Sequence, residues 1–204
     1  MTNPPSRPDE IIMRAIELAE DRGVTGVTTA TLARRLGFTE AALYRYFPAK
    51  GAILGAALQH MGEELFSNMV LDLVPRDTES MDAMESHLVA HVRQFAGRQG
   101  LLLELLLCAA SGRDNALQQS ANAFLQEYTY RLVAYFGQLQ ELDRIDRSLP
   151  AEELARMWVC QLMGGFVRSR IALEHWDPLS QPGFEAFLAQ MRQSAGAAAD
   201  VVLT

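Results

Sequence analysis

Apolar residues recur along this chain at intervals of three and four, which is the spacing of one face of an α-helix. A first helix is predicted between Pro8 and Gly23, and its apolar stripe consists of Ile12, Ala15, Ile16 and Ala19. No stretch alternates apolar and polar residues in the way a half-buried strand does. The chain is therefore expected to be all-α.

Two short helices are predicted next, separated by a turn at Gly37. Thr28 or Thr29 should cap the first and Thr39 the second, because a hydroxyl accepts a hydrogen bond from a free N–H group at a helix start. Gly37 suits the left-handed conformation that ends a helix, and Pro48 closes the second helix. The residues that can interlock the pair are Leu32, Leu36, Leu43 and Phe47. This arrangement is a helix-turn-helix.

Longer helices are predicted for the rest of the chain. One begins near Ala49 and ends before Pro75, and the others are placed at 81–97, 101–111, 114–140, 150–175 and 181–197. The expected division is a DNA-binding domain with a loose N-terminal arm at 1–51, followed by a larger helical domain at 52–204.

Charge is distributed unevenly. The net charge of −7 argues at first against a nucleic-acid partner. Residues 22–50, however, contain five basic residues and one acid, Glu40, and residues 1–60 carry +1 while the remainder carries −8. A locally basic segment on an acidic body can hold phosphate.

The run VTTATLARRLGFTEAALYRYFPAK, within residues 27–51, resembles the DNA-binding signature of the tetracycline-repressor (TetR) family. The paired threonines, the leucine–alanine spacing, the Leu-Tyr-Arg-Tyr-Phe block and the following lysine carry the resemblance. It covers about residues 9–60; beyond them, only the length and the helical pattern agree. The resemblance implies a bacterial transcriptional repressor that binds double-stranded operator DNA as a homodimer and responds to a small-molecule effector.

The resemblance also implies a set of DNA contacts. Phosphate contacts are implied for Thr29, Tyr44, Tyr46 and Lys50, and base contacts for Glu40, Ala41, Ala42 and Arg45. The chemistry agrees, since arginine can bind guanine with two hydrogen bonds, glutamate can accept from cytosine, and a methyl group can touch thymine. The family often has an arginine after the paired threonines, and this chain has Ala30 there.

A dimer interface is expected on the last two long helices. Adjacent glycines allow a second backbone to approach, and an apolar stripe follows, so the candidates are Gly164, Gly165, Phe184, Phe187, Leu188 and Met191. The family resemblance implies a four-helix bundle there. The alternative is that these residues belong only to the core of one chain.

An effector pocket is expected among the helices of 81–140 and 150–175. Its candidate lining residues are His87, His91, Phe95, Leu106, Phe124, Tyr128, Trp158 and Gln161. Aromatic residues at helical spacing are also typical of a plain core. As a pocket, this set favours an apolar or aromatic ligand.

Other function classes have weaker signals. His87 and His91 share a helix face, so a metal-responsive repressor is one alternative, although the pair lacks a protease-type glutamate. The segments Glu40–Arg45 and Gly165–Arg168 also resemble nucleoid-occlusion proteins of the same superfamily, which makes a DNA-binding cell-division regulator a second alternative. No catalytic motif is found, so neither an enzyme nor a cofactor is expected.

The location follows from what the sequence lacks. There is no signal peptide, and the longest apolar segment, 101–110, is too short to span a bilayer. No membrane partner is expected, and the protein is expected to be cytoplasmic and associated with the nucleoid. Cys108 and Cys160 are predicted to be buried thiols.

Overall fold

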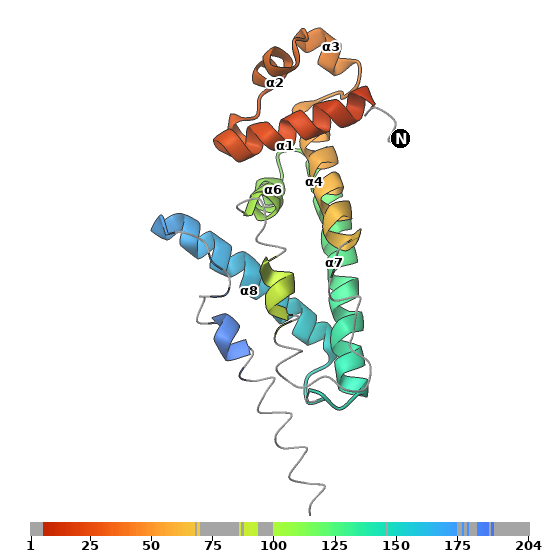
Figure 1. Cartoon of the computed structure of the whole chain (residues 1–204), viewed down its shortest axis with the longest axis vertical. Coiled ribbons are helices and arrows are strands. Elements are labelled where there is room, and N and C mark those ends of the chain that lie inside the picture. Colours follow the sequence, from red (N-terminus) through yellow and green to blue (C-terminus); the bar gives the residue numbers. More distant parts are fainter. Residues whose placement is uncertain are drawn as a thin grey trace, which may run out of the picture. The chain divides into compact units, whose positions relative to one another are not determined.

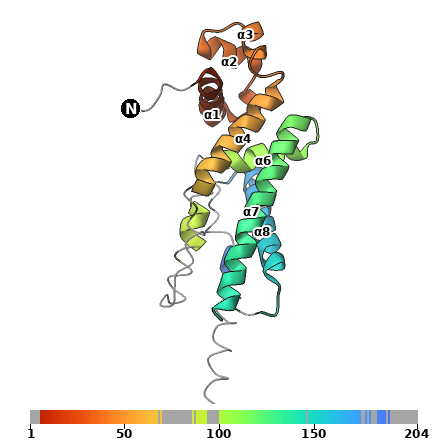
Figure 2. The same cartoon turned by 90° about the vertical axis from the view of Figure 1, so that its right-hand side faces the viewer.

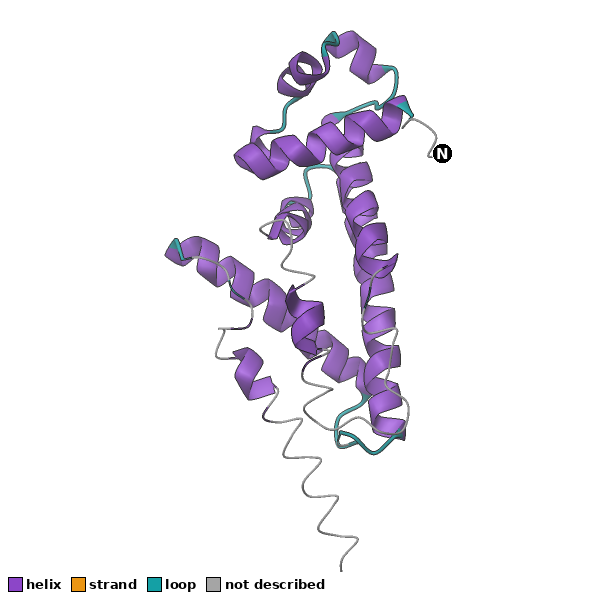
Figure 3. Cartoon of the chain, viewed as in Figure 1, coloured by secondary structure: helices purple, strands orange, loops and turns teal. Residues whose placement is uncertain are grey.

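The computed structural model describes residues 6–67, 69, 86, 88–93, 100–145, 147–174, 177, 179, 183–187 and 189. Within these residues the regular structure is helical and no strand is found (Figure 3). The prediction of an all-α fold with an N-terminal helix-turn-helix is confirmed. The predicted helices at 81–97 and 181–197 lie only partly within the described residues.

Apart from the end of α3, most of the helices begin and end close to the predicted positions (Figure 1). Their bounds are α1 (Arg7–Gly26), α2 (Thr29–Leu36), α3 (Glu40–Tyr44), α4 (Lys50–Ser67), α6 (Leu101–Ala110), α7 (Asn115–Glu141) and α8 (Ala151–Ala172). Residues 88–93 and 183–187 are also helical. None of the described helices combines the length and hydrophobicity needed to cross a membrane.

Helix α1 starts earlier than expected, so residues 6–8 are not part of a loose arm. Ser6 is its N-cap: the Ser6 hydroxyl accepts from the backbone N–H of Asp9, and the Asp9 carboxylate accepts from the backbone N–H of Ser6. The Ser6 hydroxyl also donates to the Asp9 carboxylate at 2.6 Å, and this hydrogen bond, together with the one from the Ser6 N–H, holds the pKa of Asp9 below its usual value. Such a reciprocal cap fixes the start of a helix.

The described residues form two compact units. One contains residues of 1–67 and 98–125, and the other contains residues of 68–97 and 126–204, so that α7 contributes to both. The unit that includes the helix-turn-helix thus also includes α4, α6 and the first turns of α7. The predicted domain boundary at residue 51 separates the expected DNA-binding segment from the rest of the chain by function and not by packing. It stays a prediction.

In the first unit, α1 is the central helix. It packs against α2, α4 and α6. Its buried side chains include Ile11, Ile16 and Leu18, each at most 2% exposed. Burial of three such side chains contributes about 1.5–3 kcal/mol each, so this face of α1 holds the unit together.

The second unit has an aromatic core. Trp158 of α8 lies edge-on to Phe184 and Phe187, with ring centroids 5.8 and 5.4 Å apart. Phe136 of α7 contacts Trp158 and Phe187 in the same way, at 6.3 and 6.0 Å. These edge-to-face contacts add to the free energy gained by burial. They tie residues 183–187 to α7 and α8.

A buried polar chain crosses this core. The indole N–H of Trp158 donates to the Tyr128 hydroxyl at 2.9 Å, and that hydroxyl lies 2.8 Å from Nε2 of His91. Desolvation lowers the pKa of His91 to about 3 and raises that of Tyr128. His91 is therefore neutral, and the Tyr128 hydroxyl hydrogen is available to donate to its Nε2.

The neutral state of His91 predicts acid sensitivity. Because the folded-state pKa is depressed below the ordinary value of 6.5, His91 contributes its full stability above about pH 6.5 and loses it as the pH falls toward 3. Between pH 7 and pH 5, the free energy of unfolding should fall by about 2 kcal/mol through this group. Urea unfolding at both pH values measures the change.

The control is His91→Gln, whose amide can still reach Tyr128 but does not titrate in this range. The part of the pH dependence that belongs to His91 should be missing in this variant. An equal pH dependence in both proteins would contradict the assignment.

Candidate nucleic-acid interface

Helix α2 and the turn that follows it are fixed by local hydrogen bonds. The Thr28 hydroxyl accepts from the backbone N–H of Thr31 at 3.1 Å, and the Thr31 hydroxyl accepts from that of Thr28 at 2.9 Å. At the other end, Gly37 adopts φ +69° and ψ +27°, and the N–H of Phe38 donates to the carbonyl of Ala33 at 2.8 Å. The left-handed glycine turns the chain away from α2 toward α3.

Helix α3 is shorter than predicted. Thr39 caps it as expected, accepting from the N–H of Ala42 at 3.2 Å, but the helix ends at Tyr44 instead of reaching Pro48. The N–H groups of Tyr46 and Phe47 both donate to the carbonyl of Leu43, at 2.9 and 3.0 Å, and so form a tight turn. Pro48 disfavours a helical conformation for Phe47, the residue before it, so the helix does not resume after this turn.

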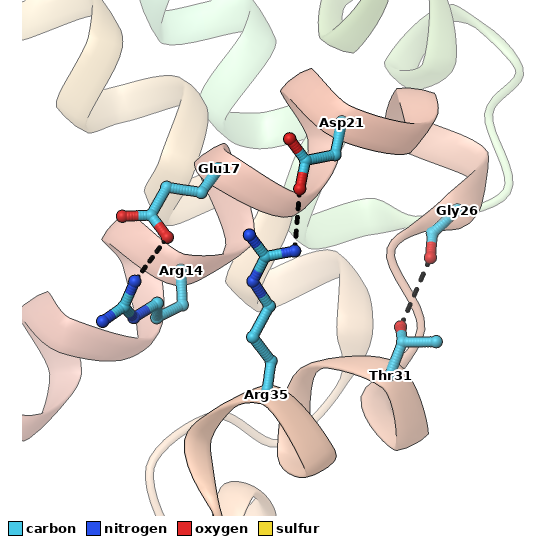
Figure 4. Close-up of polar contacts among 6 residues, drawn as sticks. All are labelled: Arg14, Glu17, Asp21, Gly26, Thr31 and Arg35. Atoms are coloured by element: carbon cyan, nitrogen blue, oxygen red, sulfur yellow. Dashed lines mark hydrogen bonds and ion pairs between the residues drawn. The ribbon is translucent and has the colours of Figure 1, made fainter.

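Contacts with α1 hold α2 in place (Figure 4). Arg35 of α2 forms an ion pair with Asp21 of α1 at 2.8 Å, and the Thr31 hydroxyl donates to the carbonyl of Gly26 at 3.3 Å. An exposed ion pair contributes little, about 0–1 kcal/mol. The larger contribution comes from the apolar seam, in which Leu32 and Leu43 are at most 1% exposed.

A carboxylate from α6 fixes the end of α1. Gly23 breaks the helix with φ +71°, and the N–H of the next residue, Val24, donates to Glu104 Oε1 at 2.9 Å. Glu104 is the only charged residue of α6, whose other residues are apolar. Its side chain satisfies a partly buried N–H group that the break in α1 leaves without a helical partner. The last turn of α1 and the entry into α2 therefore depend on α6.

The residues predicted to contact DNA belong to α2, α3, the turn after α3 and the start of α4, and none of them is fully buried. Tyr44 and Tyr46 are 49% and 45% exposed. Three further members of the set are exposed and three are half-buried; the exposed ones are Glu40, Ala41 and Arg45, and the half-buried ones are Thr29, Ala42 and Lys50. Large exposed aromatic side chains beside cations are typical of a binding surface.

Two members of this set contact each other. The Thr29 hydroxyl donates to Glu40 Oε2 at 2.6 Å, so the carboxylate of α3 is held against the start of α2. Glu40 is the single acid of residues 22–50, and it also lies in the first turn of α3, where the helix dipole favours a negative charge. The hydrogen bond and the helix dipole fix the position of the Glu40 carboxylate and reduce its repulsion of an approaching phosphate.

The cationic side chains at this surface differ in whether an acidic residue already pairs with them. Within the described part of the chain, neither Arg45 nor Lys50 has an ion-pair partner, whereas Arg35 is paired with Asp21. Lys50 is the first residue of α4, where helix N–H groups point out of the helix end. An ammonium group and free N–H groups at one place can bind a phosphate oxygen.

The predicted pocket residues fall into both units. Leu106 and Phe124 belong to the first, and His91, Tyr128, Trp158 and Gln161 to the second; His87 and Phe95 lie outside the described residues. His91, Tyr128 and Trp158 are brought together in the buried chain above. No group of three or more metal-ligating side chains occurs among the described residues.

The predicted dimer residues divide in a similar way. Phe184 and Phe187 pack on Trp158 of their own chain, Gly164 is exposed and Gly165 half-buried, while Leu188 and Met191 lie outside the described residues. The prediction that Cys160 is buried is wrong, because its thiol is on the exposed side of α8.

Sequence reasoning missed an apolar stripe along the outer side of α8. Met157 is 40% and Ile171 78% exposed, and Cys160 and Gly164 lie exposed between them on the same helical face. Half-buried Val167 completes a spacing of three and four residues, which is the spacing of a helix-packing seam. That spacing was visible in the sequence, but only the structure tells which face of α8 the core covers.

Two capped helices joined by a left-handed glycine turn form a helix-turn-helix, a motif typical of DNA-binding proteins. Residues 11–57 match the family model of the bacterial regulatory proteins of the tetR family. A relative from Haemophilus influenzae, named nucleoid occlusion factor SlmA, is 37% identical over 172 residues, which cover 80% of this chain and 76% of the relative. The chain belongs to the TetR family. It is a DNA-binding regulator and not an enzyme.

Other relatives carry the same name. SlmA of Mannheimia succiniciproducens is 42% identical over 172 residues, covering 82% of this chain and 76% of the relative. SlmA of Marinobacter nauticus is 36% identical over 129 residues, covering 62% of this chain, so the chain spans just under two thirds of that relative, 65%.

Solved structures agree with the fold. A transcriptional regulator from Rhodococcus sp. Rha1 superposes with a TM-score of 0.67 at 18% identity, over 94% of this chain and 97% of that one. A TetR-family regulator from Agrobacterium tumefaciens gives 0.67 at 15% identity, over 96% and 98%. At these identities the similarity shows the fold alone.

Replacing Glu104 tests its role at the end of α1. Glu104→Leu should lower the free energy of unfolding by about 1–3 kcal/mol, because the Val24 N–H group loses its acceptor in a partly buried position. Glu104→Gln keeps a carbonyl oxygen and should lose less than half as much. Urea unfolding of the three proteins measures both values, and equal losses in the two variants would contradict the proposed hydrogen bond.

Proposed function

We propose that this regulator binds a palindromic operator as a homodimer, represses transcription from it, and is released by a small molecule. The observation that carries the DNA-binding part is the surface where Tyr44, Tyr46 and Arg45 are exposed beside Lys50. A dimer is needed because a single short recognition helix offers too little contact for tight specific binding.

Phosphate contacts would come from Thr29, Tyr44, Tyr46 and Lys50. Tyrosine and threonine hydroxyls can donate to phosphate oxygens, and Lys50 adds a charge at the start of α4. Such contacts set the orientation of α3 on the duplex without recognising its sequence.

Base contacts would come from Glu40, Ala41, Ala42 and Arg45. Because α3 ends at Tyr44, Arg45 extends from the helix end and Glu40 from its start, about one and a half turns apart. In the free protein the Thr29 hydroxyl donates to Glu40, so a phosphate contact by that hydroxyl requires it to change its acceptor on DNA. With Ala30 unable to donate, Arg45 would be the main reader of guanine.

The dimer interface would be centred on the outer stripe of α8. Met157, Cys160, Gly164, Val167 and Ile171 present an apolar face that solvent would otherwise contact. Gly164 has open space where a Cβ would lie, which lets another helix approach closely. Gly165, Phe184, Phe187, Leu188 and Met191 remain further candidates.

A second candidate function is favoured by the name of the relatives. Proteins called nucleoid occlusion factors share 29–42% of aligned residues with this chain, so a DNA-binding regulator of cell division is the alternative. Chromatin immunoprecipitation separates the two: a repressor occupies a few promoters and leaves them when its ligand is added, whereas the second function gives many dispersed, ligand-insensitive sites. Metal response through His87 and His91 is a third possibility, tested by the metal content of the purified protein.

Substitutions at the DNA surface test the proposal. Lys50→Ala should weaken binding to every duplex and lower the slope of log affinity against log salt by about one per protomer, since one phosphate contact is lost. Arg45→Ala should cost about 1–3 kcal/mol, mainly at one base pair of each half-site. Fluorescence anisotropy at several salt concentrations measures both, and wild-type affinity in both variants would exclude this surface.

A charge placed in the α8 stripe tests the dimer. Met157→Glu and Ile171→Glu should convert the protein to monomers, because an unpaired carboxylate is costly at an apolar interface. Asn122→Glu, at an exposed position of α7, is the matched control and should leave the mass unchanged. Sedimentation velocity gives the result, and dimers in all three variants would place the interface elsewhere.

A further inference from the structure

The turn between α6 and α7 carries an exposed arginine, Arg113. Gly112 adopts φ +67°, and its N–H donates to the carbonyl of Ala109 at 3.0 Å. The Ser111 hydroxyl donates to the carbonyl of Cys108 at 2.7 Å. These hydrogen bonds fix the path of the backbone, so the arginine extends from an ordered turn.

The acids in this part of the sequence are already engaged by backbone N–H groups. Residues 101–125 contain two of them, Glu104 and Asp114. Glu104 accepts from the N–H group that follows the break in α1, and Asp114 Oδ1 accepts from two N–H groups in the first turn of α7, at 3.1 and 3.2 Å. Within the part of the chain that the structure describes, Arg113 forms no ion pair. Its guanidinium group is therefore available to an anion.

Direct contact with α4 places this turn beside the proposed DNA surface. A Cβ on Gly51 would overlap the Asp114 carboxylate, so the carboxylate lies against the backbone of the first turn of α4. Further along, a Cβ on Gly55 would lie 2.8 Å from Ser120 Oγ and 3.2 Å from the carbonyl oxygen of Ala116. Figure 2 shows the start of α7 next to α4, within the first compact unit. Two close contacts along α4 thus fix the position of the turn on this helix.

Arg113 and Lys50 are chain neighbours of the two residues that meet at the first contact, Asp114 and Gly51. Consecutive Cα atoms are about 3.8 Å apart, so both cations extend from one small region of the surface. Duplex DNA carries one negative charge per about 1.7 Å of its axis. Separate phosphates are therefore available to two cations at this spacing.

We propose that Arg113 is a second cationic phosphate contact, and that the DNA interface of this regulator extends from the helix-turn-helix to the turn between α6 and α7. The inference rests on the proposed function, because it requires that Lys50 faces the DNA backbone. Asp114 is a positioning residue that holds the turn against α4. A phosphate contact carries no sequence information, so Arg113 adds affinity for every duplex and does not help to select the operator.

Salt-dependent binding measures the contact. The full chain is titrated into a random-sequence duplex of about three helical turns, and fluorescence anisotropy gives the affinity at several salt concentrations. Arg113→Ala should weaken binding and lower the slope of log affinity against log salt by about one per protomer. Arg113→Lys should keep the slope, because it keeps the charge. A wild-type slope in Arg113→Ala overturns the proposal.

Two further variants separate a local charge effect from other causes. Arg93→Ala removes an exposed arginine of the second unit and should leave the slope unchanged. Asp114→Asn keeps an acceptor oxygen for the N–H groups of α7 and removes a negative charge beside Arg113, so it should tighten binding about two-fold. An equal loss of slope in Arg93→Ala would assign the effect to net charge, and weaker binding in Asp114→Asn would assign it to the structure of the turn. Either result overturns the proposal.

Lys50→Ala distinguishes this inference from the proposed function. If Lys50→Ala lowers the slope and Arg113→Ala does not, the surface around α3 stands and only its extension fails. If the wild-type chain does not bind the duplex, both fail. Urea unfolding of Arg113→Ala should give the wild-type free energy of unfolding, because an exposed side chain without an ion-pair partner among the described residues contributes little to stability.

Discussion

The burial of one face of α1 is the constraint on which the first unit depends. This helix packs on α2, α4 and α6, and α2 in turn packs on α3. The break at Gly23 lets the chain leave α1 toward α2, and the Glu104 hydrogen bond fixes that break. The position of α3 therefore depends on α2 and, through α2, on the helices that pack around α1.

Much of the fold could be predicted because local signals agree with the final structure. Thr28, Thr39 and Gly37 mark helix boundaries by their own hydrogen bonding or backbone preferences, and each lies where predicted. The predicted end of α3 was wrong because residues 45–47, which form a turn before Pro48, look helical when the sequence is taken alone. The residues predicted to contact DNA are close in sequence and lie on short capped helices, so local signals determine their positions, and their contact with DNA stays a prediction.

The remaining features depend on contacts between distant parts of the chain. Glu104 and Val24 are 80 residues apart, and nothing in the local sequence of either one indicates the other. Phe66 and Phe124 stack only because the fold places α4 and α7 side by side, which neither segment indicates on its own. Cys160 was predicted to be buried because the periodicity of α8 shows apolar residues on two faces, and only the core of the second unit shows which face is covered.

Binding of DNA by the surface around α3 is the central claim, and selection from a pool of random duplexes tests it most directly. The full chain is mixed with the pool, the bound duplexes are recovered over several rounds, and the product is sequenced. Two inverted copies of a short motif should be enriched, spaced for two recognition helices in successive major grooves. A bound pool with the same sequence composition as the starting pool would contradict the account.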